Sequence, residues 1–203
     1  MFTLTRRSAL LGAAASLSGC SAISTLNAAT EALDTYDLRP VAGSTSGPRR
    51  ARTLLVARPQ APATLSTDRI LVRSDAASIS YLPDARWTDE LPEVIQSLLI
   101  LSISATGRVS YVGRTDAGPV PDKALLVRID AFDVSVAADG RFMAQVDMDL
   151  TVVNDQDQRI IASRRFLQTA QASNDTPAEI VAAFQRVIED VLPTMSDWTL
   201  RQV

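Results

Sequence analysis

The fold is decided by one alternating stretch, Phe142-Met143-Ala144-Gln145-Val146-Asp147-Met148-Asp149-Leu150-Thr151-Val152. From Phe142 onward every second side chain is apolar, and most of the side chains in between are polar. Successive side chains of a β-strand point to opposite faces, so this pattern predicts a strand with one buried and one exposed face. Such a strand requires a sheet whose apolar face is covered by another element.

The residues on either side extend this prediction to an antiparallel meander. Asp139-Gly140 is a hairpin-turn pair, and it joins the stretch to a predicted strand at residues 124–136, in which alternate side chains are apolar. On the other side, a polar turn at residues 154–158 leads to a strand at residues 160–170. The segment Asn154-Asp155-Gln156-Asp157 lacks the glycine and the terminal glutamate of a calcium-binding loop, so we interpret it as part of this turn.

Two helices are predicted to cover the apolar face of the meander. The first spans residues 91–105, with Thr88 or Asp89 as its cap and a proline in its first turn. The second begins at Thr176-Pro177-Ala178-Glu179, which matches a capping box, and Pro193 kinks or ends it. Both carry apolar side chains at helical spacing: Leu91, Ile95, Leu98 and Leu99 in the first, and Ile180, Val181, Phe184, Val187, Ile188 and Val191 in the second.

Four shorter strands are predicted before the meander, at residues 54–57, 69–73, 78–81 and 109–112. Runs of strands interrupted by isolated helices are typical of the α+β class. The predicted architecture is therefore α+β, with a mostly antiparallel twisted sheet and two helices packed on one face. We assign it to a single domain at residues 53–203.

Residues 1–19 have the composition of a bacterial export signal. Arg6 and Arg7 form its charged region, an apolar run follows, and small residues lead to Cys20. The apolar run is shorter than the about 20 residues needed to cross a bilayer. The segment Leu17-Ser18-Gly19 before Cys20 resembles the lipobox of bacterial lipoproteins. In that motif the cysteine thiol receives diacylglycerol, the chain is cleaved before the cysteine, and the new amino terminus is acylated. A buried free thiol is the alternative interpretation.

The lipid anchor sets expectations for location and for the segment that follows it. Two or three acyl chains hold a protein stably at a membrane, whereas a single chain holds it only marginally. By comparison with bacterial lipoproteins, Ser21 favours the outer membrane, and an incomplete twin-arginine pattern leaves the export route open. Residues 20–52 contain a stretch rich in Gly, Pro and Ser and are predicted to form a flexible tether, in which Tyr36-Asp37-Leu38 docks as a short edge strand.

The residue inventory excludes several classes of function. The chain has 203 residues, no histidine, one cysteine and a net charge of −3, and loss of a signal that contains Arg6 and Arg7 makes it more acidic. Nucleic-acid binding is not expected, because it depends on a basic surface. Without histidine, and with Cys20 as the anchor, the chain lacks a Ser-His-Asp triad, a Cys-His pair and a zinc cluster. We expect no enzymatic activity, no metal and no cofactor beyond the acyl groups on Cys20.

Two aromatic residues and three arginines are candidates for partner contact. Tyr81 and Trp87 are of the kind that dominates interfaces, although packing within the domain is the favoured interpretation of both. Arg128, Arg164 and Arg165 lie on or beside polar strand faces, where they are suited to an acidic partner or a lipid phosphate. Cross-strand ion pairs are the favoured alternative for these arginines, with three carboxylates at hand: Asp130, Asp147 and Asp149.

An ordered set of residues resembles the ABC-type transport auxiliary lipoproteins. This family includes the Pqi-type lipoprotein associated with MCE (mammalian cell entry) lipid-transport proteins. Tyr36-Asp37-Leu38 matches a Tyr-x-Leu segment that follows the acylated cysteine in the family, and the meander and the last helix also fit. The other matching positions are Leu55, Val56, Pro59, Pro62, Leu65, Ile70, Tyr81, Trp87, Leu91, Pro92, Ile95, Gln96 and Leu99.

This resemblance implies a non-catalytic lipoprotein on the periplasmic face of a membrane, usually the outer one. It implies an auxiliary role in lipid transport between the two membranes, with the MCE-domain protein of an ABC transporter as partner. Such partners form rings, which is compatible with a homo-oligomer. Two alternatives stay open: a regulator or assembly factor of cell-envelope enzymes, such as an activator of a peptidoglycan synthase, and a carrier that holds a lipid between sheet and helices.

Overall fold

The alternating stretch forms a long strand at the middle of a meander, as predicted. In the computed structural model, which describes residues 33–75, 77–116 and 118–203, this strand is β7 (Phe142–Asn154). It lies between β6 (Lys123–Val136) and β8 (Ile160–Gln171) and pairs with both in antiparallel register. The apolar side chains of one face are fully buried: Ala144, Val146, Met148, Leu150 and Val152.

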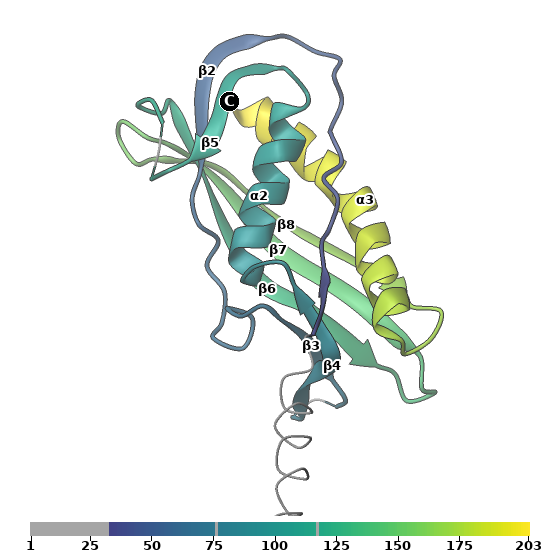
Figure 1. The fold of residues 1–203 in the computed structure, drawn as a ribbon. Coiled ribbons are helices and arrows are strands. Elements are labelled where there is room, and N and C mark those ends of the chain that lie inside the picture. Colours follow the sequence, from purple (N-terminus) through teal and green to yellow (C-terminus); the bar gives the residue numbers. More distant parts are fainter. Residues whose placement is uncertain (1–32, 76, 117) are drawn as a thin grey trace, which may run out of the picture. The chain divides into compact units, whose positions relative to one another are not determined.

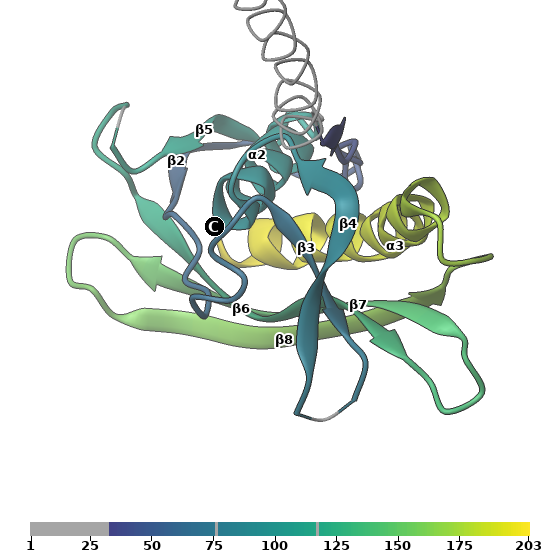
Figure 2. The same ribbon diagram turned by 60° about the horizontal axis from the view of Figure 1, so that its bottom comes forward.

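The edge of β6 that does not pair with β7 pairs with two separate groups of strands, which we call the two branches of the sheet. Near its start, β6 pairs in parallel with β2 (Arg50–Val56), which pairs in parallel with β5 (Val109–Arg114). Near its end, β6 pairs in parallel with β3 (Arg69–Arg73), which is followed by β4 (Ile79–Trp87) and β1 (Asp34–Tyr36). The eight strands of the described residues form one curled sheet (Figures 1 and 2).

The sheet is mixed and rich in parallel pairs, so the prediction of a mostly antiparallel sheet is wrong. Within the described residues, four strand pairings are parallel and three are antiparallel. The reason is connectivity, because parallel strands need a long crossover between them. Helix α2 (Leu91–Ser104) separates β4 from β5 and allows β5 to lie parallel to β2. Sequence patterns that are interpreted one strand at a time favour hairpins between neighbours and miss such crossovers.

Both helices lie on the same side of the sheet, as predicted (Figure 2). Helix α3 (Pro177–Gln202) packs against β7, β8 and α2, and the apolar positions predicted for both helices are buried. At the centre of the core, Trp87 of β4 meets Phe132 of β6 and Phe184 of α3, with ring centroids 4.7–5.8 Å apart. None of these three side chains is more than 1% exposed, so aromatic packing joins one branch of the sheet to the meander and to α3.

The predicted capping hydrogen bonds at the starts of the two helices are not formed. Neither Glu90 at the start of α2 nor Thr176 at the start of α3 makes a side-chain capping hydrogen bond. Thr176 Oγ1 instead donates a hydrogen bond to Asn174 Oδ1 at 2.7 Å, so the predicted capping box is not formed. Pro193 lies inside α3 and does not end it, because the following turns are anchored by buried side chains: Met195, Trp198 and Leu200.

The folded unit begins at Asp34, before the boundary expected at residue 53. β1 pairs with β4 and Leu38 is 2% exposed, so the chain docks on the domain here, but the edge strand is Asp34–Tyr36 and not the predicted Tyr36–Leu38. We call residues 37–49 the N-terminal strap. They have no regular structure and lie along α2 and α3. Backbone N–H groups of the strap donate hydrogen bonds to three helix side chains: Gln185 and Asp197 of α3, and Ser102 of α2.

Close packing holds the strap on α3 at Gly43. A Cβ atom at this position would lie 2.8 Å from Asp197 Oδ1 and 2.9 Å from Ser196 Cβ. From residue 34 onward, the chain is therefore part of the folded unit, whereas the sequence predicted a flexible tether up to residue 52. The predicted signal at residues 1–19 and the lipidation residue Cys20 lie outside the described residues.

Candidate functional site

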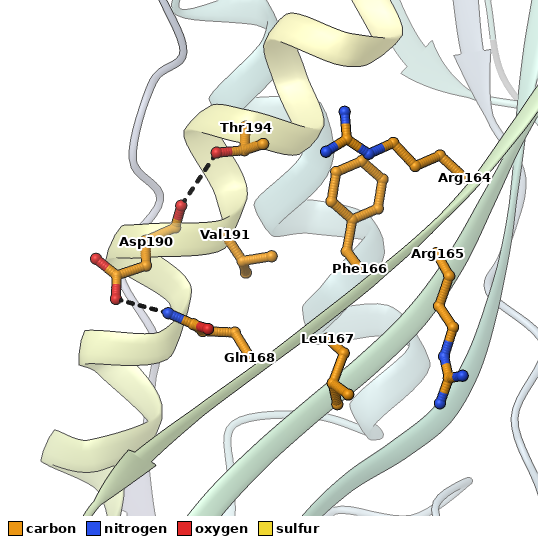
Figure 3. A pocket seen from close by; sticks show the side chains of 8 residues that line it. All are labelled: Arg164, Arg165, Phe166, Leu167, Gln168, Asp190, Val191 and Thr194. Atoms are coloured by element: carbon orange, nitrogen blue, oxygen red, sulfur yellow. Dashed lines mark hydrogen bonds between the residues drawn. The ribbon is translucent and has the colours of Figure 1, made fainter.

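Strand β8 presents different side chains to α3 and to the outer face of the sheet. Arg164, Phe166 and Gln168 lie opposite Leu150, Met148 and Val146 of β7, which are fully buried on the helix-covered face. Arg165 and Leu167 point to the other side (Figure 3). The alternation of side chains along a strand therefore separates two neighbouring arginines, and only Arg164 faces α3.

An open groove of about 270 Å³ lies between β8 and α3. Phe166 and Val191 provide its apolar surface, and Arg164, Gln168, Asp190 and Thr194 surround them (Figure 3). Gln168 Nε2 donates a hydrogen bond to Asp190 Oδ2 at 3.1 Å, which ties β8 to α3 at one end of the groove. The groove thus combines an apolar centre with charged groups, a common composition for protein-binding surfaces.

Arg164 is the cationic group at the other end of this groove. Its guanidinium carbon lies 4.9 Å from the centre of the Phe166 ring. The Phe166 ring also makes an edge contact with Trp198, with a centroid separation of 5.9 Å. The guanidinium of Arg164 forms no ion pair or hydrogen bond with any residue that the structure describes. Its charge is therefore available to an acidic group from outside the domain.

Two of the three candidate arginines form ion pairs, but only Arg165 pairs across strands, as the favoured interpretation predicted for all three. Arg165 donates hydrogen bonds to the buried carboxylate of Asp147, with an Nε to Oδ1 distance of 2.7 Å, and this contact raises the pKa of Arg165. Arg128 donates to Asp130 from Nε at 2.7 Å and lowers the pKa of Asp130. The second pair joins residues of one strand and not of neighbouring strands. In both pairs a carboxylate of the domain already neutralises the arginine, so the arginine charge is less available to a partner.

The two aromatic candidates lie in different environments. Trp87 is 1% exposed and belongs to the core, so its assignment as a partner contact is wrong, for the packing reason that the sequence interpretation favoured. Tyr81 is 39% exposed on β4, where its hydroxyl donates to Thr64 O at 3.3 Å and its ring lies under Arg69. These candidates do not form one site, because Tyr81 belongs to a branch of the sheet that is separated from β8 by β3, β6 and β7.

A second ionic cluster lies at the start of α2. Glu93 accepts hydrogen bonds from Arg114 of β5 and from Arg58, the latter with an Nε to Oε1 distance of 2.7 Å. The Arg114 hydrogen bond is the main cause of the lowered pKa of Glu93, and Arg58 adds to it. Only 22% of the Glu93 side chain is exposed, so this cluster joins α2, β5 and the segment after β2. We interpret it as structural.

Sequence reasoning missed Gln168, Asp190 and Thr194, which complete the groove. On the sequence, Asp190 and Thr194 belong to the polar side of a predicted helix, and nothing distinguishes them from other polar helix residues. Only the packing of α3 against β8 brings them to the Arg164 side of the strand. Among the described residues, there is no cluster of metal-ligating side chains and no helix long and apolar enough to cross a membrane.

The chain thus folds as an α+β domain, with a curled mixed sheet, two helices and a charged groove between β8 and α3. The chain belongs to the family of ABC-type transport auxiliary lipoprotein components, whose family model matches residues 36–196. This match confirms the resemblance inferred from the sequence, and it extends from Tyr36, the last residue of β1, into α3. Lipoproteins of this family are held at a membrane of the cell envelope and serve a transport system.

Individual relatives support the fold. The crystal structure of protein XCC0632 from Xanthomonas campestris is similar, with a TM-score of 0.76, 23% identity, and coverage of 83% of this chain and 96% of that one. The crystal structure of an uncharacterized protein has a TM-score of 0.62 and 16% identity, and covers 85% of this chain and 99% of that one. An uncharacterized protein of Bradyrhizobium diazoefficiens is 27% identical over 83% of this chain. The chain spans 45% of the length of that relative.

Proposed function

We propose that this protein is a non-catalytic auxiliary component of an MCE-type ABC transporter that moves lipids between the inner and outer membranes. In this proposal Cys20 carries the acyl groups that hold the protein at the periplasmic face of the outer membrane, and an MCE-domain protein is the partner. The observation that carries the proposal is the family match, which extends over nearly the whole folded unit from Asp34 to Val203.

The packing of the domain argues against a lipid carrier. The space between sheet and helices is filled by a continuous set of buried side chains, with the Trp87, Phe132 and Phe184 rings at its centre. A bound acyl chain would have to displace side chains that are already close-packed, which is costly in a protein core. The exposed surfaces of the domain, and in particular the groove at β8, are better suited to contacts with other proteins.

The test is an affinity pull-down of the acylated chain from crosslinked cell envelopes, with partners identified by mass spectrometry. An MCE-domain protein, its permease or its ATPase should be enriched over an untagged control. The Cys20→Ser variant reports whether anchoring is required for this contact. Enrichment of cell-wall synthases without any transport component would contradict the proposal and favour the regulator alternative.

A further inference from the structure

Strand β8 has one edge that is free to pair with another strand. Over the ranges 33–75, 77–116 and 118–203, β8 pairs with β7 alone, through eleven matched positions between Ile160 and Gln171. At its carboxyl end, Arg186 of α3 donates a hydrogen bond to Gln171 O at 2.7 Å, and the preceding part of the edge remains open. A long unpaired edge presents a row of backbone donors and acceptors that match an added strand.

The groove extends this edge with side-chain contacts at every second position. Arg164, Phe166 and Gln168 face the groove, and residues of an added strand that lie opposite them would face it too. From Arg164 to Gln168 the strand advances about 13 Å, since each residue contributes about 3.3 Å. The positive charge of Arg164 stands at one end of this interval, and the carboxylate of Asp190, bound to Gln168, stands at the other.

We propose that β8 binds an extended segment of a partner protein as an additional antiparallel strand. The segment carries a basic, an apolar and an acidic residue at alternate positions. Its acidic side chain pairs with Arg164, its apolar side chain packs between Phe166 and Val191, and its basic side chain pairs with Asp190. Main-chain hydrogen bonds supply the affinity of such strand addition, and pockets for alternate side chains supply the specificity. This surface and its charge order go beyond the proposed function, which names a partner but no contact.

Charge complementarity favours a heterologous segment over a second copy of this chain. The β8 sequence offers Arg164, Phe166 and Gln168 at alternate positions, and none of these supplies the carboxylate that Arg164 lacks. The neighbouring Arg165 also lines the groove, but its guanidinium is bound to the carboxylate of Asp147. The acidic residue of the added strand is therefore the feature that we expect to determine binding.

The test uses the full-length chain purified in detergent and two acetylated, amidated heptapeptides of identical composition. The first is Thr-Lys-Thr-Val-Thr-Glu-Thr, and the second has the reverse order. Fluorescence anisotropy measures binding, and hydrogen–deuterium exchange locates it. We expect the first peptide to bind more tightly and to protect amides at residues 160–169. Equal binding of the two peptides, tighter binding of the reversed one, or protection elsewhere would overturn the proposal.

Variants test whether peptide binding depends on the charge of Arg164 or on a general property of the β8 edge. Arg164→Ala should weaken binding of the first peptide about three- to tenfold, because one charge-assisted contact is lost at a partly exposed site. Arg159→Ala is the control, since it removes the same charge from an exposed turn residue before β8. In the double variant Arg164→Glu with Asp190→Lys, preference should move to the reversed peptide.

The oligomeric state of the Arg164→Ala variant tests whether Arg164 binds a partner or only prevents two copies of the chain from pairing along β8. If Arg164 only prevents strand association between copies, Arg164→Ala will form dimers in sedimentation experiments and will leave peptide affinity unchanged. That result would overturn the proposal. Under the proposal, the variant keeps the oligomeric state of the unmodified chain and loses peptide affinity.

Discussion

Two adjacent arginines show how far the surroundings of a residue decide its role. Arg164 and Arg165 follow each other on β8, yet one faces the groove without an ionic partner and the other neutralises Asp147 on the opposite face. Asp147 retains only 6% of its side-chain exposure, so its carboxylate depends on Arg165. At the scale of single residues, Arg165 therefore contributes to the stability of the fold, and Arg164 is the arginine for which we propose a binding role.

Trp87 gives the first prediction at this scale. Trp87→Ala should lower the free energy of unfolding by about 3–5 kcal/mol, because it leaves a cavity beside the stacked rings of Phe132 and Phe184. Tyr81→Ala removes an exposed ring and should cost less than about 1 kcal/mol. Urea denaturation measures both values. A small effect of Trp87→Ala, accompanied by a loss of partner binding, would restore Trp87 as a contact residue.

Glu93 gives a prediction on pH dependence. Its pKa is lowered in the folded state from an ordinary value of 4.5, so its contribution to stability is fully present above that value and is lost as pH falls through the folded-state pKa. Glu93→Gln should cost about 1–2 kcal/mol at pH 7, and this cost should shrink below about pH 4.5. Urea denaturation at several pH values measures the difference. The control is Glu189→Gln on the exposed side of α3, and a cost that is independent of pH would contradict the prediction.

At the scale of elements, the N-terminal strap changes how the anchor is connected to the domain. Residues 37–49 lack regular structure, but three of their backbone N–H groups donate hydrogen bonds to side chains of α2 and α3. If Cys20 carries the lipid, only residues 21–33 lie between it and the folded unit in the sequence, and not residues 21–52 as the sequence analysis predicted.

Leu38 tests whether the strap contributes to the fold. Leu38→Ala should lower the free energy of unfolding by about 2–4 kcal/mol, because the side chain is 2% exposed within the core. It should also increase proteolytic cleavage within residues 37–49. The matched control is Arg39→Ala, whose side chain is exposed. If both variants had the same stability as the unmodified chain, the strap would be only loosely associated.

At the scale of the whole molecule, β6 organises the domain. It pairs along one edge with β7 and along the other with β2 and β3 at different ends, while Gln60 bridges to it between them through Gln60 N to Val127 O at 2.8 Å. Both branches therefore depend on the same strand. We infer that the described unit from Asp34 unfolds as one body, with the strap and the meander in a single cooperative transition.

Membrane attachment is the prediction that concerns the whole protein. Cys20→Ser should move the protein from the membrane fraction to the soluble periplasmic fraction, because the acyl chains supply the attachment. In density-gradient separation, the unmodified protein should accompany the outer membrane. Immunoblots of the fractions measure both results. A Cys20→Ser variant that stays with the membrane would show that another segment anchors the chain.

The sequence by itself determined which segments become strands and helices of the meander side. The alternation in β7, the turns at Asp139-Gly140 and after Asn154, and the apolar faces of both helices are local patterns with one dominant structural solution. The ordered residues that resemble the auxiliary lipoproteins also identified the family, as the match over residues 36–196 confirms. The first and last turns of the helices were less determined, because capping depends on hydrogen bonds to neighbouring loops.

Only the tertiary structure decided the parallel pairing of β2, β3 and β5, the docking of the strap and the composition of the groove. Each depends on contacts between residues far apart in the sequence, such as Gln168 with Asp190 or Ser44 with Asp197. Strand direction follows from where a crossover helix returns the chain, and this is set by packing of the complete domain. For the same reason Arg164 and Arg165, indistinguishable in sequence, differ in whether a carboxylate is within reach.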